Sequence, residues 1–151
     1  MMIMRRILLP ILAILLCIPV MAEDIEIKPE QLPEKSQQII AKAFPDAKIK
    51  KANIEKRASL MQYEVKISGG VKLQFSKDGT FTECDCTDSY VPEILIPQKI
   101  RTVIDREFPG RKVKRIEHDS KIYELTLDNG DELSFNRSYK LIDIDSFLDR
   151  K

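Results

Sequence analysis

The chain has 151 residues, of which 43% are hydrophobic, and its 25 Lys and Arg residues nearly balance its 24 Asp and Glu residues. This near-neutral balance argues against nucleic acid as an obligatory partner, because nucleic-acid binding normally requires a strong basic excess. Trp is absent and aromatic residues make up 7% of the chain, which disfavours a carbohydrate-stacking groove.

The N-terminus has the pattern of a cleavable signal peptide. Arg5 and Arg6 form a short positive region, and the apolar residues 7–20 carry no charge. Val20 and Ala22 then supply small residues at the −3 and −1 positions of a cleavage site. The apolar stretch is shorter than the roughly 20 residues of a membrane-spanning helix, so we expect no stable membrane insertion after cleavage. An uncleaved membrane anchor is the alternative.

Removal of residues 1–22 leaves residues 23–151, enough for a single domain with its own core. The removed segment contains Cys17, two basic residues and no acidic residue. The mature chain therefore keeps 23 of the 25 basic side chains against 24 acidic ones. We expect a periplasmic or secreted protein.

The mature chain contains an internal repeat. Matching segments recur at a spacing of 64 residues and then, after a four-residue contraction, at a spacing of 60 residues. So many matches in the same order predict two tandem repeats, at about residues 30–86 and 94–147. The matches are Leu32-Pro33 with Ile96-Pro97, Phe44-Pro45 with Phe108-Pro109, Tyr63-Glu64-Val65 with Tyr123-Glu124-Leu125, Gly70 with Gly130, and Leu73 and Phe75 with Leu133 and Phe135.

Each repeat is predicted to begin with a helix. Pro33 and Pro97 suit the first turn of a helix, where the missing N–H has no cost. Pro45 and Pro109 should end the helices, because the residue before proline disfavours the helical region. Apolar residues at helical spacing line one face of each helix: Ile39, Ile40, Ala43 and Phe44 in the first, and Ile100, Val103, Ile104 and Phe108 in the second.

Antiparallel strands follow each predicted helix. Apolar and polar residues alternate over residues 62–67 and 123–128, the pattern of a sheet with one buried face. Glycines at 68–70 and 128–130 predict tight hairpins into strands that bury Leu73 with Phe75 and Leu133 with Phe135, and short strands are expected at 80–84 and 141–144. The fold class is α+β: two tandem helix-plus-antiparallel-strand repeats form one continuous antiparallel sheet, with the helices on one face and a polar face opposite.

These motifs together resemble a known family. A helix that ends in Phe-Pro, a strand that begins Tyr-Glu, and a Gly-x-x-Leu-x-Phe hairpin occur twice behind a signal peptide. This arrangement, over residues 32–144, resembles the PepSY-like periplasmic proteins of Bacteroides-type bacteria, which are similar in fold to β-lactamase inhibitor protein. The resemblance implies a periplasmic or secreted location and protease-inhibiting or peptide-binding roles, with no established catalytic residues. The sequence departs from the repeat where Ser138-Tyr139-Lys140 replaces Lys77-Asp78-Gly79, and at the insert Cys84-Asp85-Cys86.

The predicted polar sheet face supplies most of the candidate partner-binding residues. An inhibitor-like protein would dock a protein or peptide of the cell envelope on such a surface, although a merely solvated face explains the same residues. Phe81, on a short strand, and Tyr90, in the connector at residues 87–96, are candidate aromatic anchors, because interfaces favour aromatic centres. The polar candidates are Glu64, Lys66, Lys72 and Gln74 in the first repeat and Glu124, Thr126, Glu132 and Ser134 in the second.

Cys84 and Cys86 are the cysteines of the mature chain. An oxidising compartment favours a disulfide between an even pair. On an extended strand, however, residues two apart place their Cα atoms near 7 Å, at the limit for bridging. A disulfide, two packed thiols, and a metal or redox role therefore all stay open. His118 and Asp88 have no spacing typical of metal ligands, so no metal site is predicted.

The basic segments at residues 48–51 and 112–115 recur at the repeat spacing. They indicate either a positive sheet edge that attracts an acidic partner or lysines that prevent pairing of an exposed edge. The turn at 128–132 is acidic but lacks the spacing of a calcium loop.

No catalytic or cofactor motif is present: one histidine supports no Ser–His–Asp arrangement, and no two carboxylates stand out. The sequence thus predicts a non-enzymatic binding or inhibitor-like module without a cofactor. The alternative is an envelope sensor or a metal- or redox-responsive protein that uses Cys84 and Cys86.

Overall fold

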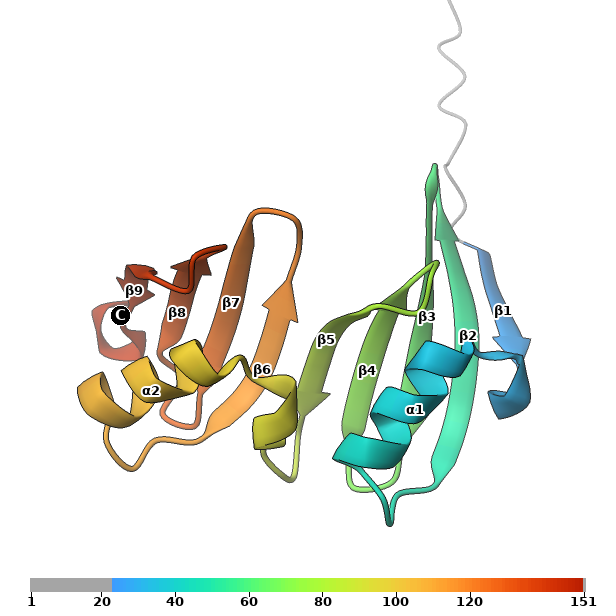
Figure 1. Ribbon diagram of the computed structural model, residues 1–151, viewed down its shortest axis with the longest axis horizontal. Coiled ribbons are helices and arrows are strands. Elements are labelled where there is room, and N and C mark those ends of the chain that lie inside the picture. Colours follow the sequence, from blue (N-terminus) through green and yellow to red (C-terminus); the bar gives the residue numbers. More distant parts are fainter. Residues whose placement is uncertain (1–22, 151) are drawn as a thin grey trace, which may run out of the picture.

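The computed structural model describes residues 23–150, and the predicted signal peptide lies outside the described residues. Nine antiparallel strands form one sheet in which the strands follow their order in the sequence (Figure 1). Two α-helices, α1 (Glu34–Ala43) and α2 (Gln98–Glu107), complete an α+β fold. The strands are β1 (Glu23–Ile27), β2 (Ile49–Arg57), β3 (Leu60–Ile67), β4 (Val71–Ser76), β5 (Phe81–Cys86), β6 (Val113–His118), β7 (Ile122–Leu127), β8 (Glu132–Asn136) and β9 (Leu141–Asp145).

One apolar core lies against the sheet face that carries the helices. Ile40 of α1 and Ile100 and Ile104 of α2 belong to the same buried cluster as the inward residues of the strands, such as Leu73 and Leu125. The period-two alternation in the strands explains this arrangement, because it sends apolar side chains to one face and polar side chains to the other. The predicted sheet with one polar face is confirmed.

The backbone repeats itself at the spacing found in the sequence. The polypeptide enters α1 and α2 through Pro33 and Pro97, whose φ and ψ angles are −54° and 140°, and −52° and 134°. Both prolines lie one residue before the helix rather than in its first turn as predicted, because a ψ near 140° is extended. Phe44 and Phe108 end the two helices with similar angles, −137° and 65°, and −130° and 59°.

Irregularities of the sheet are repeated as well. The register shifts at Ile49/Lys51 and again at Val113/Arg115, and it shifts at Gln74/Phe75 and again at Ser134/Phe135. The turn before the last strand of each repeat has the same backbone geometry although its sequence differs. Tyr139 has a φ of 61° at the position where Gly79 has a φ of 83°. The tandem repeat therefore extends to local backbone geometry.

The basic segments lie at the starts of interior strands but largely outside their pairing: β1 pairs with residues 52–56 of β2, and β5 pairs with residues 115–117 of β6, so residues 48–51 and 112–114 have no partner strand on that side. Strand β2 lies between β1 and β3, and β6 lies between β5 and β7. Strand β1, which no sequence pattern indicated, pairs through Glu23–Ile27 with residues 52–56 of β2. The strand expected at residues 80–84 is β5, which continues to Cys86 and therefore contains both cysteines.

Gly79 offers a test of how closely α1 packs on the β4–β5 turn. A Cβ atom at Gly79 would lie 2.7 Å from Pro33 Cβ and 3.0 Å from Ser36 Oγ, whereas one at Gly110 meets no atom within 4 Å. Both glycines have positive φ, 83° and 77°, so both alanine variants carry backbone strain of roughly 1–2 kcal/mol. Gly79→Ala should lower the free energy of unfolding in urea by about 2 kcal/mol more than Gly110→Ala, because of the added clash. Equal losses in the two variants would contradict this packing.

Candidate functional site

The face of the sheet opposite the helices, here called the polar face, contains the polar candidates predicted from the sequence. Glu64 lies directly opposite Gln74, and Lys66 lies directly opposite Lys72, on β3 and β4. Thr126 lies opposite Glu132 on β7 and β8. Because β5 and β6 join the two halves of the sheet, these residues belong to one continuous surface.

An ion-pair cluster that the sequence analysis missed occupies the centre of the polar face. The Glu83 carboxylate on β5 accepts a hydrogen bond from Arg115 Nε on β6 at 3.0 Å and lies 3.4 Å from Lys72 Nζ on β4. Arg115 also donates to Glu117. Glu83 is 4% exposed although no helix covers this face, so the neighbouring side chains shield it. The alternation Glu83-Cys84-Asp85-Cys86 could have placed Glu83 here, had the cysteines been treated as apolar.

Glu124, Thr126 and Glu132 meet at a hollow of about 220 Å³ over β7, β8 and β9. Asp143 and Asp145 of β9 line the same hollow, and so do Arg115 and Ser134. This acidic hollow contains four carboxylates, Glu124, Glu132, Asp143 and Asp145, and a single cationic side chain, Arg115. Its excess of carboxylates makes it suitable for a cationic group.

Lysines line a second hollow at the other end of the polar face. Lys50, Lys66 and Lys72 surround a space of about 340 Å³ over β2, β3 and β4. Lys66 Nζ lies 3.4 Å from Glu64, but its side chain remains 56% exposed. This lysine hollow is suitable for an anionic group, so the two ends of the polar face differ in charge.

Phe81 does not serve as an exposed aromatic anchor. It is 9% exposed and belongs to the core, where its ring centroid lies 6.3 Å from that of Phe75 and 5.9 Å from that of His118. The register shift at Gln74/Phe75 pairs Phe81 with Phe75 and thereby turns Phe81 toward the helix side. The expectation for Phe81 is therefore wrong.

Tyr90 is the exposed aromatic residue of the connector, residues 87–96. It is 50% exposed, and Lys114 Nζ lies 5.1 Å from its ring centroid. The same ammonium group donates hydrogen bonds to the carbonyl oxygens of Thr87 and Ser89, at 2.7 and 3.0 Å. These contacts fix the connector and hold the Tyr90 ring in place.

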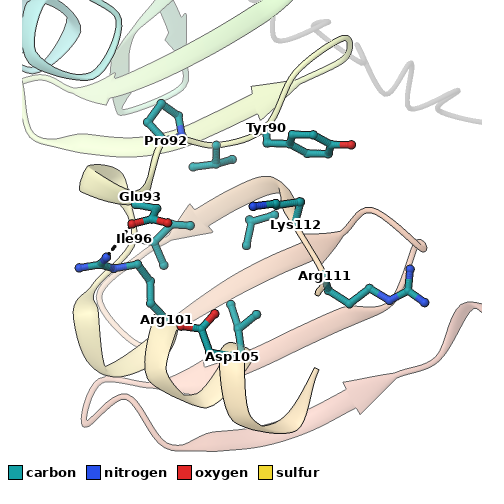
Figure 2. A pocket seen from close by; sticks show the side chains of 11 residues that line it. Tyr90, Pro92, Glu93, Ile96, Arg101, Asp105, Arg111 and Lys112 are labelled. Atoms are coloured by element: carbon teal, nitrogen blue, oxygen red, sulfur yellow. Dashed lines mark hydrogen bonds and ion pairs between the residues drawn. The ribbon is translucent and has the colours of Figure 1, made fainter. Parts of the chain in front are cut away.

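Tyr90 lines a cavity of about 300 Å³, here called the connector pocket, between the connector, α2 and the start of β6 (Figure 2). Its floor is apolar and buried. Charged side chains surround the opening, and Figure 2 shows Arg101 and Asp105 coming from α2 and Lys112 extending toward the connector. The floor consists of Val91, Ile96, Ile104 and Val113.

The charges at the connector pocket are partly paired. Arg101 donates to Glu93 Oε2 at 3.1 Å, whereas the buried Arg101 Nε has no hydrogen-bond partner in the described structure. Arg111 lies 3.6 Å from Asp128 and extends outward in Figure 2. An apolar floor below a Tyr ring and charged groups is the combination that holds one side chain of a peptide.

A hollow of about 490 Å³ adjoins the connector pocket and is lined in part by the short 3-10 helix Glu93–Leu95. Glu93, Ile96 and Arg101 line both spaces. His118 and Tyr123, whose ring centroids lie 4.9 Å apart, also line this hollow of about 490 Å³. Burial lowers the pKa of His118 below its ordinary 6.5, and the charge of Arg137 acts in the same direction.

Cys84 and Cys86 are buried free thiols on the helix side of β5, with their Sγ atoms 3.7 Å apart. The hydrogen bond with Cys86 and burial both raise the pKa of Cys84. The same hydrogen bond lowers the pKa of Cys86. Reactive thiols need access to solvent, and Cys84 and Cys86 are only 0% and 1% exposed, so both are packed side chains. Within residues 23–150, no group of three or more His, Cys, Asp or Glu side chains is arranged to hold a metal ion.

None of the helices in the described part of the chain is long and apolar enough to cross a membrane.

Comparison with known proteins identifies similar sequences and structures. The chain matches the family described as "Putative beta-lactamase-inhibitor-like, PepSY-like" over residues 20–83 and over residues 61–143. No curated protein sequence matches. A crystal structure of a "putative periplasmic protein" of the DUF2874 family from Bacteroides vulgatus is 36% identical with a TM-score of 0.79, over 82% of this chain and 98% of that chain.

Two further crystal structures are similar over nearly their whole length. A "putative calcium-regulated periplasmic protein" from Bacteroides thetaiotaomicron is 38% identical with a TM-score of 0.79, over 82% of this chain and 97% of that chain. A "putative periplasmic protein of unknown function" from Bacteroides vulgatus is 32% identical with a TM-score of 0.78, over 82% of this chain and 100% of that chain.

The buried position of Glu83 predicts its contribution to stability. Glu83→Gln keeps the shape of the side chain but removes the charge that Arg115 and Lys72 contact. Because hydrogen bonds to charged groups are worth roughly 1.5–3 kcal/mol, we expect a loss of about 2 kcal/mol in urea unfolding. Glu64→Gln is the matched control, since its partner Lys66 is solvent-exposed, and should cost less than about 1 kcal/mol. A larger loss for Glu64→Gln would show that the cluster is not the stabilising one.

His118 predicts a pH dependence of stability. Its pKa is lowered in the folded state, so its contribution is present above the unfolded value of 6.5 and is lost as the pH falls through the lower folded value. The wild-type protein should therefore lose more stability than His118→Phe between about pH 7 and pH 5. Thermal unfolding at each pH measures this difference, and parallel curves for the two proteins would refute it.

Proposed function

Because the chain belongs to the PepSY-like, beta-lactamase-inhibitor-like family, we propose that it is a non-enzymatic binding module that holds a peptide or a protein segment in the connector pocket. The observation that carries this proposal is the half-exposed Tyr90 ring, fixed by Lys114 above a buried apolar floor. A fixed aromatic ring loses little conformational freedom on binding, which favours affinity.

The lining of the connector pocket defines the chemistry of the bound segment. The volume of about 300 Å³ accommodates one apolar side chain and its neighbouring backbone. Lys112 offers donors to a carboxylate or to backbone carbonyl groups, and Asp105 offers acceptors to backbone N–H groups. We therefore infer an apolar residue beside an acidic group as the preferred ligand.

The proposed location is the periplasm. The signal-peptide pattern at residues 1–22 supports export, and the similar structures from Bacteroides are described as periplasmic. The partner would then be a protein or peptide of the cell envelope. An inhibitor role is the special case in which that partner is an enzyme, and assays of envelope proteases and β-lactamases with the purified protein test it.

We also infer that each repeat consists of one helix followed by its strands. Helix α1 precedes β2–β5, and α2 precedes β6–β9, with equivalent caps at Pro33 and Pro97. This arrangement places the connector, and hence the pocket, between two equivalent units.

One similar protein is described as calcium-regulated, but this proposal does not include calcium. At the acidic turn, Asn129 Nδ2 donates to Asp131 Oδ2 at 2.7 Å, and the backbone N–H of Phe147 donates to Asp131 Oδ1 at 3.0 Å. Both carboxylate oxygens of Asp131 therefore already accept hydrogen bonds from neighbouring residues. A redox or metal role for Cys84 and Cys86 stays a prediction, which their 3.7 Å separation permits and their burial disfavours.

A peptide-display selection tests the proposed function. The protein recovered from the cell envelope is immobilised and exposed to a random peptide library, and the enriched peptides should carry an apolar residue next to an acidic one. Tyr90→Ala and Lys112→Glu should each weaken binding of these peptides by about tenfold or more, as expected for a central contact. Fluorescence polarisation with a labelled peptide measures the dissociation constants.

Two further variants serve as controls. Tyr90→Phe keeps the ring and should bind as the wild type does, and Lys121→Glu makes the same charge change at the exposed β6–β7 turn, away from the pocket. If no peptide is enriched, the binding role is wrong. If the peptides bind Tyr90→Ala as tightly as the wild type, the role of the connector pocket is wrong.

A further inference from the structure

In one row of residues across the polar face, the positive and negative side chains are grouped at opposite ends. The row, here called the charge row, takes one residue from each strand between β2 and β9, and neighbours in it are directly opposite each other in register. Lysines occupy its first part and carboxylates its last part, with Asp85 and Arg115 between them. In strand order the row is Lys51, Lys66, Lys72, Asp85, Arg115, Thr126, Glu132 and Asp145.

This separation has a cost within a single copy of the chain. Lys66 lies directly opposite both Lys51 and Lys72, and Glu64 beside Lys66 and Glu83 beside Lys72 offset part of the repulsion. Like charges at directly opposite positions destabilise a sheet. An alternating order would avoid this repulsion among the lysines, so the observed order suits a partner surface that brings carboxylates to them.

The charge row is complementary to itself under a half-turn. A two-fold axis parallel to the strands and midway between β5 and β6 places β2 of one copy over β9 of the other, β3 over β8, and β5 over β6. Lys51 then faces Asp145, Lys66 faces Glu132, and Asp85 faces Arg115 of the second copy. Each pairing occurs twice, as in any two-fold interface.

The neighbouring row obeys the same operation. The half-turn places Asn53 over Asp143, Glu64 over Ser134, and Gln74 over Glu124, so that amide or hydroxyl groups face carboxylates and can donate to them. Glu83 faces Glu117, and Arg115 contacts both of these carboxylates within each copy. Residue pairing in the second row is therefore compatible with the contact.

The shape and the size of the polar face also fit a second copy. A twisted sheet is saddle-shaped, and a half-turn about its central strand direction superposes the saddle on itself, so two such sheets stack face to face. Eight overlapped strands at about 4.8 Å, with five residues each at about 3.4 Å, cover roughly 650 Å² per copy. Specific interfaces bury about 800 Å² per partner. In this arrangement the Lys66 side chain, which is 56% exposed, faces the acidic hollow of the other copy.

We propose that two copies of this chain associate through their polar faces, with the lysine hollow of each copy against the acidic hollow of the other. The connector pocket lies on the helix side of the sheet and stays open in this dimer. The dimer does not rest on the proposed peptide binding. A protein that dimerises without binding peptides, or binds peptides as a monomer, separates the two.

Charge reversal tests the proposal. The full chain is expressed and exported, and the protein recovered from the cell envelope is studied by sedimentation velocity. A dimer should form at about 20 mM salt and dissociate at about 500 mM, because screening weakens exposed charge pairs. Lys66→Glu and Glu132→Lys should each raise the dimer dissociation constant by about tenfold or more, since each places like charges face to face. The double variant K66E/E132K should return it to within about threefold of the wild-type value.

The double variant keeps the proposal falsifiable if a single substitution disturbs folding, because a misfolded chain would not recover its dimer. Lys99→Glu makes the same charge change on the solvent-exposed side of α2, away from the polar face, and should leave the dimer unchanged. A monomer at low salt and about 100 µM protein overturns the proposal. A dimer that both single variants leave intact also overturns it, because the copies would then associate through another surface.

Discussion

The pairing of β5 with β6 holds the two halves of the molecule in one sheet. Three register pairs make this junction, Glu83 with Glu117, Cys84 with Ile116, and Asp85 with Arg115. Cys84 and Ile116 are fully buried on the helix side, and the Glu83–Arg115 ion pair lies on the other side. A short pairing therefore combines apolar burial on one face with a shielded charge pair on the other, and the continuity of both faces depends on it.

This junction also creates the connector pocket. Once β5 ends at Cys86, the chain leaves the sheet and must cross to the helix side before α2 can begin at Gln98. The connector is held by Lys114 and by the hydrogen bond from the Val91 N–H to the Val113 carbonyl at 2.8 Å. It therefore stands beside β6 and encloses a cavity with an apolar floor. The pocket is a consequence of joining two repeats in one sheet.

The two surfaces of the molecule suit different contacts. The connector pocket is small, partly apolar and located between rigid elements, which suits a single side chain of a peptide. The polar face is broad and charged, and its charge row suits a surface of opposite charge order. Because the sheet separates the two surfaces, a second copy on the polar face and a peptide in the connector pocket do not compete.

The sequence by itself determined the repeat, the α+β class, the apolar face of each helix and the side of the sheet on which most polar residues lie. These features are local: proline stops, hairpin glycines and period-two alternation act over a few residues. Alternation over residues 62–67 and 123–128 was enough to assign Glu64, Lys66, Glu124 and Thr126 to the polar face.

Only the tertiary structure decided which strands are neighbours and what the irregular segments contact. It placed β1 beside β2, and a register shift turned Phe81 into the core. It also joined β5 to β6 and thereby completed the Glu83 cluster and the charge row. Such contacts join residues far apart in the chain, and they depend on the register of every strand between them, which alternation alone does not specify.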